Sequence, residues 1–158
     1  MTMNDHARLG EEHPQCDRAQ LLMLAAFICV WAADSFLLRL TAYGGLAPWP
    51  IRGVLGVALA SAGAYLVSES HKLVIESSSP TLVSRGVYGL SRHPMYLGIL
   101  LVYLGLAAST LSAMALAVWT GAFLVYDRLA AYEERDLEAR LGREYAEYRG
   151  RVRRWLLF

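Results

Sequence analysis

This sequence has few cysteines and lysines, and its net charge is close to zero. Its 158 residues include two cysteines and one lysine, and the formal net charge is +1. Cys16 lies in a polar stretch and Cys29 in an apolar one, so we expect no disulfide between them. Neither a C-x-x-C pair nor a His/Cys spacing typical of zinc occurs, which predicts no metal. The low net charge argues against nucleic acid as a partner.

Long apolar runs, in contrast, are abundant, and hydrophobic residues make up 56% of the chain. A bilayer core about 30 Å thick needs about 20 apolar helical residues. Four segments approach this length, namely residues 19–38, 51–67, 95–108 and 111–126, with only Ser109 and Thr110 between the last two. The pattern predicts an all-α integral membrane protein with about four transmembrane helices, the last two forming a helical hairpin. The alternative, a soluble helical protein, would have to cover uncharged runs such as 53–67.

Residues 1–18 predict a polar N-terminal leader before a single domain over residues 19–158. No small-x-small cleavage site follows the first apolar segment, so that segment does not resemble a signal peptide. The loop at 68–93 and the tail after Asp127 hold most of the Arg and Lys, and the hairpin turn has none. Because positive residues favour the cytoplasmic side, we expect the loop, the tail and the N-terminus there. The arginine-rich composition indicates a bacterium of high GC content, and hence location in the bacterial inner (plasma) membrane.

Local signals predict several element boundaries. Pro94 suits the first turn of a helix, which places His93 just before it, where free backbone N–H groups can receive a carboxylate. Residues 69–79 are polar and rich in serine, and they predict a loop. Apolar residues recur at helical spacing after Asp127. They predict a solvated, salt-bridged cytoplasmic helix, interrupted at Gly142 or Gly150.

Two features of the first two apolar segments each have two interpretations. Small residues at 53, 56, 60 and 63 predict a helix-packing face, either within the chain or in a homo-oligomer. Asp34 lies in an otherwise apolar segment, and it is either functional or an interface residue near Arg39.

Two polar clusters contain the candidate reactive groups. One lies just before an apolar run and the other follows the end of one. The first contains Arg92 and His93, and the second contains Glu133 and Glu134. Taken singly, Arg92 could reach lipid phosphates, His93 could cap a helix, and the two glutamates could be exposed to solvent. If both clusters face one compartment, they can close over a single ligand.

The combination resembles the isoprenylcysteine carboxyl methyltransferase family, together with related membrane phospholipid methyltransferases. The similarity covers roughly the C-terminal half of the chain. It begins at Thr81-Leu82-Val83-Ser84-Arg85-Gly86-Val87-Tyr88 and continues through Arg92-His93-Pro94-Met95-Tyr96-Leu97-Gly98. It resumes at Glu133-Glu134 and includes Leu137, Leu141-Gly142-Arg143-Glu144-Tyr145 and Tyr148.

The resemblance implies a cytoplasmic site for S-adenosylmethionine. The cofactor-binding positions that it implies are Thr81, Leu82, Val83, Tyr88, His93, Pro94, Met95, Tyr96 and Glu133. The catalytic candidates are Arg92, His93, Glu133 and Glu134, and the substrate-binding candidates are Arg128 and Tyr132. Leu129 stands where eukaryotic members carry an arginine on the substrate side, and Pro80 stands where they can carry a histidine.

The implied reaction is methyl transfer to a lipophilic small molecule or lipid that enters from the bilayer. A prenylcysteine-type carboxylate needs no deprotonation before it attacks the methyl group. A phosphatidylethanolamine-type amine does, and His93 or a glutamate would then act as the base. A membrane reductase or a non-enzymatic scaffold of similar fold would have the same helical pattern.

Overall fold

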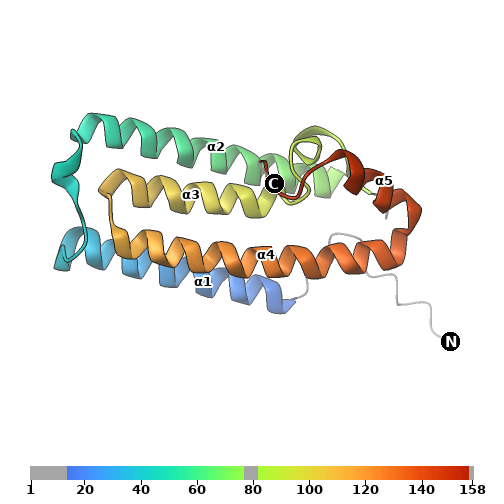
Figure 1. Ribbon diagram of the computed structural model, residues 1–158, viewed down its shortest axis with the longest axis horizontal. Helices are drawn as coiled ribbons and strands as arrows, with labels where there is room; N and C mark the ends of the chain where they lie inside the picture. The colour runs from blue at the N-terminus through green and yellow to red at the C-terminus, as the bar shows by residue number, and fades with distance from the viewer. Residues whose placement is uncertain (1–13, 77–81, 157–158) are drawn as a thin grey trace.

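The computed structural model describes residues 14–76 and 82–156, and within these ranges the protein is helical without strands. In chain order the elements are α1 (Pro14–Ala32), the π-helix η1 (Ala33–Leu38), the 3-10 turn η2 (Gly44–Leu46), α2 (Trp49–Glu76), the 3-10 turn η3 (Gly86–Gly89), α3 (Pro94–Thr110), α4 (Ala113–Leu141) and α5 (Arg143–Arg151). The long helices run side by side as an elongated bundle, with α5 folded across one end (Figure 1). The predicted all-α class is confirmed. Residues 1–13 of the predicted leader and residues 77–79 of the predicted loop lie outside the described ranges.

Among the described residues, three helical segments are long and apolar enough to cross a membrane, namely Gln20–Leu38, α2 and α4. The fourth, α3, has 17 residues and is shorter. It lies between α2 and α4 in the bundle (Figure 1). The four helices correspond to the four predicted segments. Their lengths and apolar composition are those of an integral membrane protein.

The predicted hairpin between α3 and α4 is confirmed, but its turn lies two residues later than predicted. Leu111 adopts a left-handed conformation with φ 52°, and Ser112 caps α4 by accepting the backbone N–H of Ala115. Ser109 and Thr110 remain helical because their hydroxyls bond back to carbonyls of α3, including that of Leu106.

The predicted loop at 69–79 is wrong over its first part, because α2 continues to Glu76. The serines at positions 68 and 70 do not break the helix. Ser70 is fully buried and donates to the carbonyl of Leu66 at 2.6 Å, and Ser68 donates to that of Tyr65. A serine hydroxyl that bonds to the preceding turn leaves the backbone ladder intact.

Asp34 ties together the two connections at one end of the bundle. Its carboxylate accepts from the backbone N–H and hydroxyl of Thr41, at 2.9 and 2.7 Å, and from the hydroxyl of Ser112 at 2.5 Å. The backbone N–H of Tyr43 also bonds to the carbonyl of Leu111. These contacts hold the α1–α2 connection against the α3–α4 turn. Asp34 therefore has a structural role. The turn η3 lies with α5 at the other end of the bundle (Figure 1).

The predicted small-residue face is confirmed as a packing surface within the chain at residues 56, 60 and 63, but not at Gly53. Gly56 and Gly63 of α2 meet Gly105 and Gly98 of α3. A Cβ added at Gly56 would lie 2.8 Å from the carbonyl oxygen of Gly105, and one added at Gly98 would lie 2.6 Å from that of Gly63. Because real Cβ atoms do not approach backbone so closely, glycine is required for this helix separation.

We expect Gly56→Leu to lower the free energy of unfolding by about 1–3 kcal/mol, because overpacking forces the two helices apart. Gly53→Leu is the matched control, since a Cβ at Gly53 meets nothing within 4 Å. Thermal unfolding of both variants in detergent measures the difference. Equal midpoints for the two variants would contradict the close approach of α2 and α3.

Candidate active site

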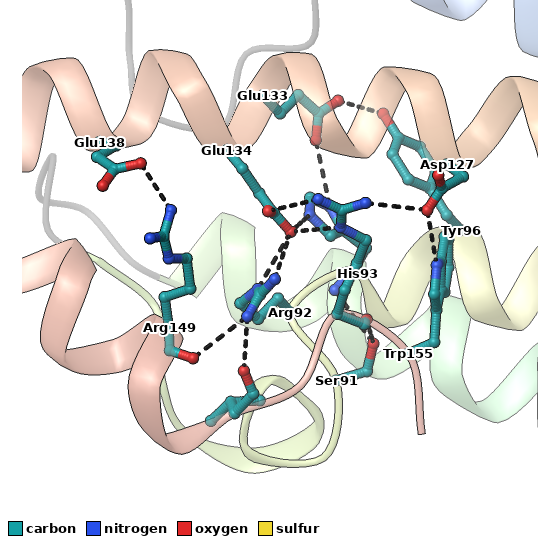
Figure 2. A network of polar contacts seen from close by, with 12 residues as sticks. Ser91, Arg92, His93, Tyr96, Asp127, Glu133, Glu134, Glu138, Arg149 and Trp155 are labelled. Atoms are coloured by element: carbon teal, nitrogen blue, oxygen red, sulfur yellow. Dashed lines mark hydrogen bonds and ion pairs between the residues drawn. The ribbon is translucent and has the colours of Figure 1, made fainter. Parts of the chain in front are cut away.

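The polar residues gather at the end of the bundle where α3 begins (Figure 2). His93 occupies the position before the first turn of α3, and Pro94 begins the helix as predicted. The Ser91 hydroxyl accepts from the His93 backbone N–H at 3.2 Å and donates to the Arg154 carbonyl at 2.6 Å. The imidazole is therefore held at a fixed point at the end of the bundle, facing the last turns of α4.

The His93 imidazole lies between the two adjacent glutamates of α4. Its Nδ1 is 3.4 Å from Oε2 of Glu133, and its Nε2 is 3.2 Å from Oε1 of Glu134. Only the protonated ring can donate to both carboxylates at once. The predicted proximity of the histidine and the acidic pair is confirmed, whereas their sharing of one ligand stays a prediction.

Glu134 is the centre of a buried ionic cluster. Its Oε1 accepts from Arg92 Nε and Nη2 at 3.1 and 2.9 Å and from Arg154 Nε at 2.9 Å. Its Oε2 accepts from Arg154 Nη2 at 2.9 Å. The Glu134 side chain is only 7% exposed, so its charge needs these partners. Both oxygens already accept hydrogen bonds from side chains of the protein. Glu134 therefore positions Arg92, Arg154 and His93.

Glu133 has a different environment from its neighbour. Its side chain is 36% exposed, and its Oε1 accepts from the Tyr96 hydroxyl. The Tyr96 ring lies parallel to the His93 imidazole, with the centroids 5.8 Å apart, and also stacks on Tyr126. The site thus offers one accessible carboxylate beside an aromatic and imidazole stack.

The environment of His93 favours its charged form. Burial lowers the pKa of the imidazole, but hydrogen bonds and charge from Glu133 and Glu134 outweigh it, so the pKa of His93 is raised above its ordinary value of 6.5. A raised pKa in the folded state adds stability below pH 6.5, and this stability is lost as the pH rises through the folded-state value.

We therefore expect the thermal midpoint of the protein to fall as the pH rises from about 6.5 through the pKa of folded His93. His93→Gln should flatten that part of the curve, because the neutral amide does not titrate. Melting curves at a series of pH values, at constant ionic strength, measure the slope. An identical slope in the variant would assign the effect to another group.

The sequence did not predict the contribution of residues 152–155, which fold back over the site after α5. Arg92 donates its backbone N–H to the carbonyl of Arg153 at 3.0 Å and its Nη1 to that of Val152 at 2.9 Å. Asp127 Oδ1 accepts from Arg154 Nη1 and from Trp155 Nε1, each at 3.0 Å. The predicted solvated, salt-bridged tail is confirmed for the exposed ion pairs of α4 and α5, but it is wrong for Glu134 and Trp155, which are buried. No local motif marks Arg154 among the arginines of the tail.

The remaining predicted site residues are placed as follows. Thr81 lies outside the described ranges, as does Pro80. Leu82 and Val83 are partly buried in the segment leading to η3. Tyr88 lies in η3, and its carbonyl accepts from the Tyr148 hydroxyl at 2.7 Å. Met95 lies in the first turn of α3.

Arg128 and Tyr132 do not join this cluster. Both lie on α4, and Tyr132 is 73% exposed. Helical spacing places them away from the face that carries the buried Ala130 and Glu134. Their assignment to the substrate stays a prediction.

Comparison with known proteins bears on this site. A family model described as phospholipid methyltransferase matches residues 51–144, which include His93, Tyr96 and both glutamates but not Arg154 or Trp155. No solved structure matches the chain.

Three curated proteins are similar to the chain. The cobalt-zinc-cadmium resistance protein CzcN of Cupriavidus metallidurans is 39% identical over 63% of this chain and 45% of its own length. Protein-S-isoprenylcysteine O-methyltransferase B of Arabidopsis thaliana is 39% identical over 53% of this chain and 39% of its own. Methanethiol S-methyltransferase 2 of Bradyrhizobium diazoefficiens is 26% identical over 87% of this chain and 58% of its own. The matches thus span less than two thirds of each relative.

Proposed function

Because the chain belongs to the phospholipid methyltransferase family, we propose that it transfers a methyl group from S-adenosylmethionine to a lipophilic acceptor in the membrane. The main support for this proposal is the contact between His93 and Glu133 at the end of the apolar bundle. Both residues lie in the matched segment, and two relatives with methyltransferase in their names support the reaction class.

The residues present suit the chemical groups of S-adenosylmethionine. The accessible Glu133 carboxylate can accept hydrogen bonds from the ribose hydroxyls or the α-ammonium group. Tyr96 has a buried ring that stacks with His93 and Tyr126, and its hydroxyl donates to this carboxylate and orients it. When bound, the cofactor supplies an electrophilic methyl group.

The protein's own part in the reaction is to position the reacting groups and to exclude water. Arg92 and Arg154 hold Glu134, and Glu134 holds one nitrogen of His93. The other nitrogen faces Glu133, so the accessible carboxylate is oriented by a buried network. Orientation of reacting groups can lower a barrier by roughly 7–11 kcal/mol. Arg92, Glu134 and Tyr96 therefore act as positioning residues, and Glu133 and His93 are the groups proposed to contact the cofactor.

The environment of His93 favours a prenylcysteine-type carboxylate as the acceptor. An imidazole that donates to two carboxylates already carries its proton, so it cannot take one from the acceptor. A carboxylate attacks without losing a proton and needs no base. An acceptor that must lose a proton, such as a phospholipid ammonium group or a thiol, is the second candidate, because the exposed Glu133 can accept that proton.

Methyl transfer from radiolabelled S-adenosylmethionine tests the proposal. The purified protein, in lipid nanodiscs, is incubated with a farnesylcysteine carboxylate, phosphatidylethanolamine or a lipophilic thiol. We expect base-labile label on the carboxylate, as an ester. Label on the amine or thiol would support the second candidate. Absence of transfer, together with a nicotinamide bound to the purified protein, would indicate a reductase instead.

A further inference from the structure

A cavity lies beside the candidate active site. It has a volume of about 420 Å³ and is lined by Asp127, Trp155 and five arginines, namely Arg92, Arg149, Arg151, Arg153 and Arg154. His93, Tyr96 and Glu133 do not line it. The cavity, here called the arginine pocket, therefore shares the ionic cluster with the active site without including the groups assigned to the methyl donor.

The lining of this arginine pocket is net positive. Glu134 pairs with Arg92 and Arg154, Asp127 pairs with Arg154, and Glu138 pairs with Arg149 at 2.7 Å. Even without Arg153, four guanidinium groups meet three carboxylates. Arg151 supplies the excess, because among the described residues its guanidinium bonds to the carbonyl of Glu147, at 3.3 Å, and to no carboxylate. An anion bound in the pocket would neutralise this excess positive charge.

The position of the pocket indicates the source of the anion. Asp127 directly follows Tyr126, the last residue of the apolar run in α4. Leu156, next to the pocket wall at Trp155, is half exposed, as is Leu90 on the neighbouring loop. The pocket thus opens where the apolar surface of the bundle gives way to polar residues. Lipid phosphates lie at this depth.

We propose that the arginine pocket binds the phosphate of an anionic phospholipid headgroup. The guanidinium groups of Arg151 and its neighbours hold the phosphate, and the exposed apolar surface beside Trp155 receives the start of the acyl chains. This binding is independent of the proposed methyl transfer. It anchors the segment 152–155, which closes over the active site, to the membrane surface.

Lipid titration of the full chain in neutral detergent tests this site. The thermal midpoint is followed by tryptophan fluorescence during addition of dioleoyl phosphatidylglycerol or dioleoyl phosphatidylcholine, without methyl donor. We expect stabilisation by the anionic lipid and a weakening of its binding by about tenfold in Arg151→Glu. Arg151→Gln is the milder variant and should weaken binding less. Arg143→Glu makes the same change of charge on α5 outside the pocket, where Arg143 is 92% exposed, and should bind like the parent protein.

Three outcomes would overturn the proposal. Equal stabilisation by both lipids would show that the headgroup charge is not recognised. Equal losses in Arg151→Glu and Arg143→Glu would assign the binding to the overall charge of α5. Full stabilisation by inorganic phosphate alone, with no further effect of the lipid, would make the pocket a site for soluble phosphate. None of these results bears on methyl transfer, so the two proposals fail separately.

Discussion

Replacing Glu134 by alanine is expected to destabilise the protein by about 3–5 kcal/mol, the cost of leaving buried charges without their partner. The carboxylate holds Arg92, Arg154 and His93, and its loss leaves three donors facing one another. The same change should release the segment 152–155, since the Arg154 side chain would keep only its contact with Asp127. Thermal unfolding in detergent, with limited proteolysis of the C-terminal segment, measures both effects.

Glu138→Ala is the control for this prediction. Glu138 also pairs with an arginine, Arg149, but its side chain is 44% exposed, and an exposed pair contributes at most about 1 kcal/mol. A midpoint for Glu134→Ala no lower than that of Glu138→Ala would show that the buried cluster is not a main support of the fold.

Replacing Glu133 by glutamine is expected to reduce methyl transfer by roughly a hundredfold while leaving the fold intact. Loss of a charged acceptor removes about 1.5–3 kcal/mol per hydrogen bond. Since Glu133 is partly exposed and outside the arginine cluster, stability should change little. His93→Ala should show a similar loss of turnover. It should also keep its fold, because Glu134 remains paired with Arg92 and Arg154. Initial rates and binding of the donor by calorimetry measure the effect.

Asp136→Asn serves as the matched control, because Asp136 is an exposed carboxylate on the same helix, paired with Arg140 at 2.9 Å. It should retain the parent rate. If Glu133→Gln also retains it, Glu133 is not a cofactor contact and the proposed site must be redrawn. If both Glu133→Gln and His93→Ala unfold, the carboxylate and imidazole are structural instead.

The helical architecture follows from local signals, and these are visible in the sequence. Apolar runs that approach bilayer length predicted the four helices, and Pro94 marked the start of α3. The boundaries that were wrong involve hydroxyl residues, at Ser109, Thr110 and Ser70. A serine or threonine can either end a helix or bond back to its own preceding turn, and the sequence does not distinguish the two.

The sequence predicted only part of the site, namely the residues that lie beside apolar runs. His93, Glu133 and Glu134 stand out because each follows or precedes an apolar run, and their convergence needs only that the α3–α4 hairpin close. The residues that complete the cluster, Arg154 and Asp127, carry no such mark. Their pairing depends on where the chain runs after α5.

The order of amino acids is enough to specify a helical protein, suited to a membrane, with a histidine and an acidic pair at one end of its bundle. Hydrophobic length and local backbone preference fix those properties, and both depend on neighbouring residues. The enclosure of Glu134 by Arg92 and Arg154, while Glu133 stays accessible, depends instead on tertiary packing. Two adjacent glutamates on one helix point in different directions, about 100° apart. Which of them is buried is set by the segments that pack against each face.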